Sequence, residues 1–195
     1  GKRYEAYRYT GADGRSDFYG ADGRSLRKAF IRTPVEFTRI SSRFSSARQH
    51  PILGRMRAHK GVDYAAPTGT PVHAAGSGTV LFVGVQSGYG NVIQLQHGQA
   101  TTTLYGHLSR FAKGLKRGQK VQQGEVIGYV GKTGLATGPH LHYEFRVAGV
   151  HRDPLSVDLP KADPLTGAEL ANFQQAREGY ATALAVVADQ ALVVR

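Results

Sequence analysis

Short runs of β-branched and aromatic residues fill the centre of the chain, between residues 61 and 152. Clusters of glycine separate these runs, and no apolar spacing of three or four residues appears between them. Short strands bounded by turn residues are typical of antiparallel sandwiches and barrels. We therefore predict a mainly β fold, an antiparallel β-sandwich or barrel-like domain. Its expected strands are residues 78–85, 91–96, 101–108, 125–130 and 140–147.

The two ends of the chain show different patterns. Residues 1–30 contain the sequence GADGRS twice, each time with the Asp-Gly pair that signals a turn, and are expected to form a small β-meander. Apolar residues three or four apart predict an amphipathic helix over residues 167–188, packed on the β-domain or on the N-terminal strands. Thr166 is its expected N-cap, and Glu169 would complete a capping box.

These patterns divide the chain into three expected segments. Residues 1–38 would be the end of a preceding small β-domain with a connector, residues 39–160 the main domain, and residues 161–195 a helical tail. Residues 45–56 are polar and basic and are expected to form a loop.

The chain has 195 residues and a net charge of +11, and the charge is unevenly distributed. Residues 1–60 hold 14 basic and 5 acidic side chains, against 11 and 9 in the remainder. Such a field attracts a polyanion, whether a nucleic acid, an anionic envelope polymer or a carboxylate-rich glycan; a merely soluble, charged surface is the plain alternative. We expect no nucleic-acid partner, because no recognition helix, zinc finger or aromatic RNP-type motif accompanies the charge.

Cysteine is absent from the sequence. Disulfides and thiolate zinc sites are therefore excluded, and any metal must be held by His, Asp or Glu. No apolar run is long enough to span a bilayer, and no secretory signal is visible, as expected of a mature form or a fragment.

His140 and His142 are separated by one residue within an expected strand. Alternate side chains of a strand share a face, so the two imidazoles point the same way and Leu141 points the other way. The two rings could share a metal, or one could bind a metal while the other moves a proton. The plain alternative is a polar strand face with two solvated histidines.

A second segment, HKGVD at residues 59–63, contributes a histidine and an aspartate, and Gly61 favours a loop leading into a short strand over residues 62–65. Zinc binds imidazole nitrogen and carboxylate oxygen. His59, Asp63 and His142 would supply three ligands and leave a fourth position open for water. An open position is the mark of a catalytic zinc site, because structural sites are closed by four protein ligands.

Three motifs together resemble the M23 peptidases, the LytM/lysostaphin-type family. They are HKGVDYAAP at 59–67, YGHL at 105–108 and TGPHLHYE at 137–144, and the resemblance extends over about residues 41–159. It is closest to the Gram-negative peptidoglycan DD-endopeptidases of the cell envelope. In those proteins a small β-domain precedes the catalytic domain.

The resemblance implies that His59, Asp63 and His142 bind Zn2+ and that His140 and His107 are catalytic. Zinc would activate water, His140 would move its proton, and His107 would hold the carbonyl or the developing oxyanion. The remaining histidines are expected to be ordinary, with no carboxylate motif around them: His50, His73, His97 and His151.

The implied function is hydrolysis of peptide cross-links in bacterial peptidoglycan, between D-Ala and meso-diaminopimelate, in the periplasm or cell envelope. The alternative is a catalytically inactive LytM-like module that binds peptidoglycan and activates another wall hydrolase, although such relatives typically lack metal ligands. One position departs from the family pattern. Lysostaphin-like members often have a Tyr about six residues before the first ligand, where this chain has Leu53, and Arg43, Arg55 or Arg57 could replace its charge stabilisation.

Overall fold

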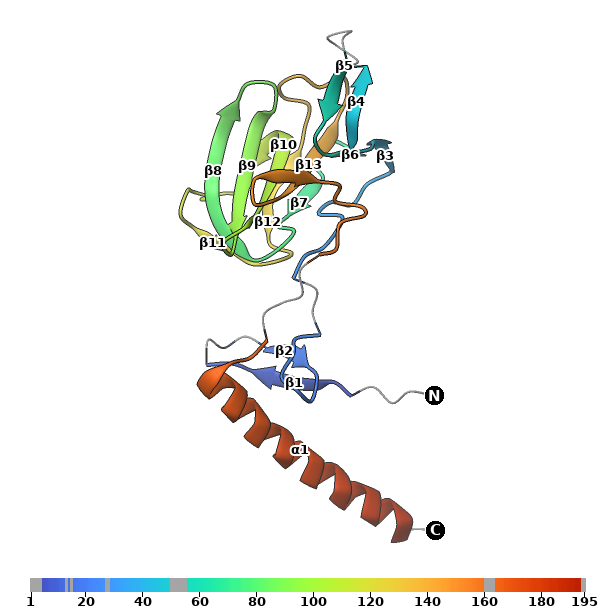
Figure 1. Cartoon of the computed structure of the whole chain (residues 1–195), viewed down its shortest axis with the longest axis vertical. Coiled ribbons are helices and arrows are strands. Elements are labelled where there is room, and N and C mark those ends of the chain that lie inside the picture. Colours follow the sequence, from blue (N-terminus) through green and yellow to red (C-terminus); the bar gives the residue numbers. More distant parts are fainter. Residues whose placement is uncertain are drawn as a thin grey trace. The chain divides into compact units, whose positions relative to one another are not determined.

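The computed structural model describes residues 5–12, 14, 16–26, 29–49, 56–159 and 164–193 (Figure 1). The chain forms two compact units, one of residues 30–158 and one that joins residues 1–29 to residues 159–195. These units are not the three expected segments. Phe30 and Val35 belong to the core of the larger unit, where they are 5% and 4% exposed, and the N-terminal strands pack with the C-terminal helix.

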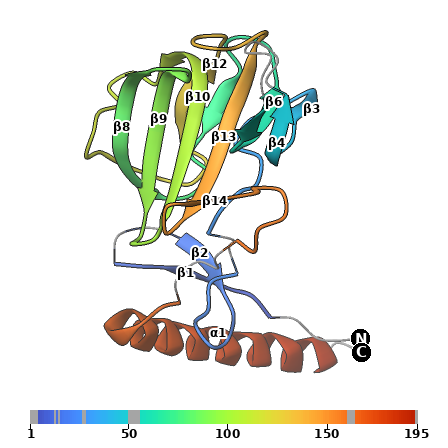
Figure 2. The same cartoon turned by 45° about the horizontal axis from the view of Figure 1, so that its top comes forward.

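The larger unit is built from antiparallel strands, and the predicted mainly β fold is confirmed. The main sheet has the order β11-β8-β9-β10-β13-β6-β3, with β12 pairing β10 and β7, and β14 pairing β13 (Figure 2). Each of the five predicted strands is present, with ends that differ by at most three residues. The strands are β3 (Arg39–Ser42), β4 (Ser45–Gln49), β5 (Met56–His59), β6 (Val62–Ala65), β7 (Pro71–His73), β8 (Gly78–Gln86), β9 (Gly90–His97), β10 (Thr101–Phe111), β11 (Lys120–Val121), β12 (Val126–Val130), β13 (His140–Val147) and β14 (Val150–Arg152).

Strand β13 has two different faces, because successive side chains of a strand point to opposite sides. Leu141, Tyr143 and Phe145 are at most 1% exposed and belong to the hydrophobic core. Fully enclosed side chains from other strands complete this core: Tyr64, Ile93, Leu95, Leu104, Tyr105, Leu108 and Ile127. The alternate positions of β13 form a polar row: His140, His142, Glu144 and Arg146.

The predicted loop over residues 45–56 is wrong for its first part. Strand β4 pairs with β5, and Ser45 lies opposite His59. Strand pairing is made by backbone groups, so a polar and basic composition does not exclude it. Leu53 and Arg55 lie outside the described residues.

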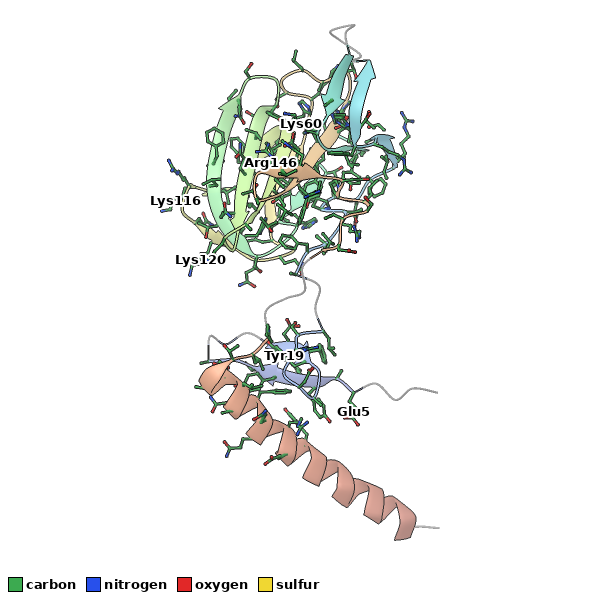
Figure 3. The ribbon with its side chains drawn as sticks, viewed as in Figure 1. Glu5, Tyr19, Lys60, Lys116, Lys120 and Arg146 are labelled. Carbon is green, nitrogen blue, oxygen red and sulfur yellow. The ribbon has the colours of Figure 1, made fainter. Side chains whose placement is uncertain are left out.

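The smaller unit consists of a β-hairpin and a helix, β1 (Tyr7–Thr10), β2 (Ser16–Tyr19) and α1 (Gly167–Val193). Phe173 of α1 is 1% exposed and its ring meets three tyrosine rings. The ring centroid of Phe173 lies 6.3, 5.5 and 5.7 Å from those of Tyr7, Tyr9 and Tyr19. Figure 3 labels Tyr19 in this unit. Of the two expected packing surfaces, the helix uses the N-terminal strands.

The first turn of α1 differs from the predicted capping box. The carbonyl of Thr166 accepts a hydrogen bond from the amide of Leu170, as at a helix start. The carboxylate of Glu169, however, accepts from the Tyr9 hydroxyl at 2.9 Å and from the Ala12 amide at 3.0 Å. A tertiary contact with the hairpin therefore takes the place of the local cap. In its described part, α1 is not apolar enough over a sufficient length to cross a membrane.

Replacing Phe173 by alanine should selectively destabilise the smaller unit, by about 3–5 kcal/mol, because the ring fills the space between three tyrosines. Hydrogen exchange should show faster exchange in β1, β2 and the first turns of α1, with unchanged protection in β8–β13. Tyr180→Ala, on the same helix but 51% exposed, is the control. Equal protection of the hairpin in the Phe173→Ala protein and the wild type would contradict the assigned packing.

Candidate metal centre and active site

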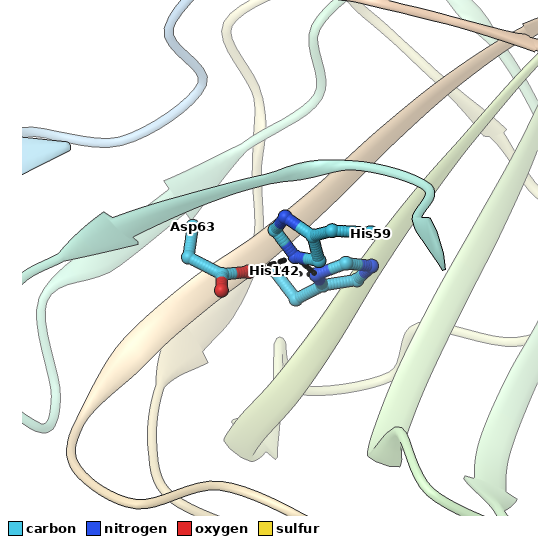
Figure 4. Close-up of side chains that lie close together, drawn as sticks. All are labelled: His59, Asp63 and His142. Atoms are coloured by element: carbon cyan, nitrogen blue, oxygen red, sulfur yellow. Dashed lines mark hydrogen bonds and ion pairs between the residues drawn. The ribbon is translucent and has the colours of Figure 1, made fainter. Parts of the chain in front are cut away.

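Three of the predicted site residues meet at the start of β13. Strands β6 and β13 are antiparallel with His142 opposite Asp63, and directly opposed residues share a face of the sheet. His59 ends β5, four residues before Asp63. Oδ1 of Asp63 lies 2.7 Å from Nδ1 of His142 and 3.0 Å from Nε2 of His59, and these two nitrogens are 3.2 Å apart (Figure 4). All three side chains are buried.

The outer nitrogens of both histidines bind acceptors on the side away from this cluster. Nδ1 of His59 donates to the carbonyl of Arg43 at 2.8 Å, and Nε2 of His142 donates to Oε1 of Glu144 at 3.1 Å. A carbonyl or an ionised carboxylate can only accept, so these nitrogens carry the hydrogens. The other ring nitrogens are then free to coordinate, and they face the carboxylate of Asp63. This donor set fits a zinc ion with three protein ligands and an open position.

The surroundings of His142 favour its protonated form. Burial alone would lower the pKa of His142, but hydrogen bonds and charge from Asp63 and Glu144 raise it to about 9. Burial alone would raise the pKa of Asp63, yet its hydrogen bonds with His142 and His59 hold it well below its usual range. His142 is therefore an imidazolium at neutral pH, held between two carboxylates.

His140 lies beside this cluster on the same face of β13. Its Nε2 is 3.8 Å from Oδ1 of Asp63, and its Nδ1 donates to the carbonyl of Gly138 at 2.8 Å. The hydrogen is thus on Nδ1, and Nε2 carries the lone pair. An imidazole with this tautomer can accept a proton at Nε2, near the position expected for the metal.

His107 reaches the site from a break in the regular pairing of β10. The register against β9 shifts between Tyr105 and Leu108, and His107 has a φ of 59°, in the left-handed region. Its amide donates to the carbonyl of Tyr89 at 2.8 Å, which holds this backbone in place. Its ring centroid is 4.7 Å from that of His140. The structure thus brings all five predicted residues together; their individual roles stay predictions.

The protonation of His107 bears on its expected role. Nδ1 donates to the carbonyl of Thr133 at 2.7 Å, which leaves Nε2 as an acceptor. Burial, reinforced by His140 and His142, lowers the pKa of His107 to about 4. The ring is therefore neutral at neutral pH. It can donate a hydrogen bond to an oxyanion from Nε2 only after it takes up a proton.

Glu144 and its partners were not among the residues predicted from the sequence to form the site. The strand alternation that places His140 and His142 on one face also places Glu144 there, so a signal was present. The interpretation of His151 as ordinary is wrong, because its Nε2 lies 3.1 Å from Oε2 of Glu144. β14 folds back on β13 with His151 opposite Arg146, a pairing that the sequence pattern does not encode.

The other candidates of the sequence analysis contribute less. His73 and His97 use Nδ1 to bind the carbonyls of Gly124 and Ser77, respectively. His50 lies outside the described residues. Arg43 acts through its backbone carbonyl on His59, and the structure describes no side-chain position for Arg57.

An antiparallel β-domain that carries three side chains able to hold a metal ion, with two further histidines beside them, is the arrangement expected of a hydrolytic metal centre. The match to known families is more specific. Residues 57–154 match peptidase family M23, and the chain belongs to this family of metallopeptidases. The resemblance seen in the three motifs is confirmed.

Two curated relatives and one solved structure show the range of similarity. Peptidoglycan DD-endopeptidase ShyC of Vibrio cholerae is 46% identical over 155 residues, which cover 80% of this chain and 35% of the relative. DD-carboxypeptidase/endopeptidase Mpg of Neisseria meningitidis is 50% identical over 156 residues, 78% of this chain and 35% of the relative. A zinc-containing peptidase from Vibrio cholerae superposes with a TM-score of 0.64 and 38% identity, covering 80% of this chain and 47% of that one. The chain thus spans about a third of the length of these two curated relatives.

Zinc affinity should fall as the pH falls, because zinc must displace the proton of His142. The pKa of His142 is raised to about 9, so below that pH its protonated form predominates when no metal is bound. The apparent affinity should then drop about tenfold for each unit between pH 8 and pH 6. Competition titrations against a chelator of known pH dependence measure this slope. An affinity that stays constant over this range would contradict the protonated cluster.

Proposed function

We propose that this chain is a zinc-dependent endopeptidase that hydrolyses peptide cross-links of bacterial peptidoglycan, at the bond between D-Ala and meso-diaminopimelate. The observation that carries the proposal is the arrangement of His59, Asp63 and His142 as an open metal site, with the Nε2 lone pairs of His140 and His107 beside it. Binding residues and proton acceptors thus lie in one cluster, in which His140 is half-buried and the other four residues are buried.

The metal and the histidines would have separate tasks. A bound zinc ion supplies Lewis-acid polarisation of the scissile carbonyl and lowers the pKa of the attacking water. His140 takes the water proton at Nε2 and delivers it to the leaving amine. His107 offers a second acceptor and, once protonated, donates from Nε2 to the oxyanion. The hydrogen bonds to Gly138 and Thr133 keep both rings in the required tautomer.

Two observations support a peptidoglycan substrate. The relatives ShyC and Mpg are named as a peptidoglycan DD-endopeptidase and a DD-carboxypeptidase/endopeptidase. In addition, two exposed lysines are next to the site in the sequence. Lys60 follows His59, and Lys132 precedes Thr133, whose carbonyl binds His107. Their charges would complement the carboxylates of stem peptides. Such a substrate implies action in the periplasm or cell envelope.

The inactive-module alternative receives no support from the site. A module that only binds peptidoglycan and activates another hydrolase does not require metal ligands or a proton acceptor. This chain has all three expected ligands and both histidines, each oriented by a hydrogen bond.

Loss of either the proton acceptor or a ligand should abolish cleavage. With zinc-loaded protein and purified cross-linked muropeptide dimers, mass spectrometry should show dimers converted to monomers. His140→Ala should slow this conversion by about 10²–10⁴-fold, the usual contribution of a general base. Asp63→Ala should lose both zinc and activity.

His73→Ala is the matched control, because His73 lies on β7 and, among the described contacts, its ring bonds only to the Gly124 carbonyl. It should cleave at the wild-type rate. Cleavage by His140→Ala at the wild-type rate would exclude the assigned base. Release of terminal D-Ala in place of dimer cleavage would show a different bond specificity.

A further inference from the structure

Glu144 carries a carboxylate that is completely enclosed, with the residue 0% exposed. Its side chain lies on the same face of β13 as those of His142 and Arg146. Arg146 is labelled in Figure 3. Burying a carboxylate is costly unless its oxygens are hydrogen-bonded and its charge is paired. The proposed chemistry above does not use this group, so its retention in the interior calls for another reason.

Both oxygens of this carboxylate have two partners. Oε1 accepts from the Tyr89 hydroxyl at 2.7 Å and from Nε2 of His142 at 3.1 Å. Oε2 binds the guanidinium of Arg146, with Nε at 2.9 Å, and Nε2 of His151 at 3.1 Å. One side of the carboxylate thus faces His142, and the other faces the Arg146 guanidinium and the His151 ring.

Tyr89 connects this carboxylate to the second half of the site. It lies in the turn between β8 and β9, and its hydroxyl fixes Oε1 of Glu144. The carbonyl of the same residue accepts from the amide of His107 at 2.8 Å, where the backbone is left-handed. The ring of Tyr89 also packs 5.6 Å from that of His142, centroid to centroid. Tyr89 therefore contacts both Glu144, which binds the expected ligand His142, and the backbone of His107, the expected catalytic histidine.

We propose that Glu144, oriented by Tyr89, is a positioning residue that holds the His142 ring with Nδ1 toward the metal and so sets the metal affinity of the site. The inference rests on the proposed metal site. The physical basis is that a carboxylate on the outer nitrogen of a metal-binding imidazole fixes its tautomer and orientation and increases its donor strength. Arg146 and His151 hold the opposite oxygen, so that the Oε1 lone pairs keep their direction.

Glu144→Gln tests this role with little change of shape. A glutamine oxygen turned toward His142 would place the amide hydrogens against the donors of Arg146 and His151. The opposite amide orientation would remove the acceptor from His142. The zinc dissociation constant, measured by chelator competition at fixed pH, should rise about 10–100-fold. The absorption bands of the Co2+-loaded protein should also change, which a purely structural role of Glu144 would not cause.

Two further variants keep the test decisive if Glu144→Gln folds poorly. Tyr89→Phe retains the ring but removes one donor to Oε1, and should weaken zinc binding roughly 2–10-fold. Tyr143→Phe is the matched control on the same strand. Its side chain lies on the core face, and its hydroxyl has no hydrogen-bond partner among the described residues, so zinc affinity should not change.

The outcomes separate this inference from the proposed function. Folded Glu144→Gln protein, or Tyr89→Phe protein, with wild-type zinc affinity and an unchanged Co2+ spectrum would overturn the positioning role while leaving the metal site intact. Wild-type protein that fails to bind zinc would overturn the metal site, and the positioning role with it. Weaker zinc binding in both variants, but not in Tyr143→Phe, is the expected result.

Discussion

The register between β6 and β13 is the constraint on which the site depends. It places Asp63 opposite His142, and a slip of one residue would turn the polar row of β13 into the core. Burial of the alternate apolar row, Leu141, Tyr143 and Phe145, opposes such a slip. The hydrophobic effect thus fixes the geometry of a polar cluster, even though no apolar side chain belongs to that cluster.

Electrostatics then hold the ligands in place before any metal arrives. The protonated ring of His142 lies between Asp63 and Glu144, with Nδ1–H toward Asp63 and Nε2–H toward Glu144, so its positive charge separates the two carboxylates. Exchange of the Nδ1 proton for a metal ion needs little movement of the strands. The cost of enclosing these charges is offset by pairing, since the Arg146 guanidinium balances the far side of Glu144 and the His151 ring lies against the same oxygen.

Features governed by local periodicity were predictable from the sequence. Runs of β-branched and aromatic residues between glycines predicted the strands, and apolar residues three or four apart predicted the helix near the C-terminus. The alternation of side chains along a strand predicted the common face of His140 and His142. The same alternation along β13 places Glu144 on the face of His140 and His142. The position of His107 at a break in β10, and the contact of Tyr89 with Glu144, depend on pairings between distant segments. Glu169 shows the same limit, because a distant hairpin replaced its local capping partner.

The smaller unit combines a hairpin and a helix from opposite ends of the sequence, and this has a consequence for biosynthesis. Tyr9 and Glu169 are separated by 160 positions. At ribosomal rates of about 5–20 residues per second, the hairpin waits roughly 8–32 s for its helix to be synthesised. All strands of the larger unit are made within that interval. The larger unit is therefore complete in sequence before the smaller one, and until the helix follows, the apolar face of the hairpin lacks its packing partner.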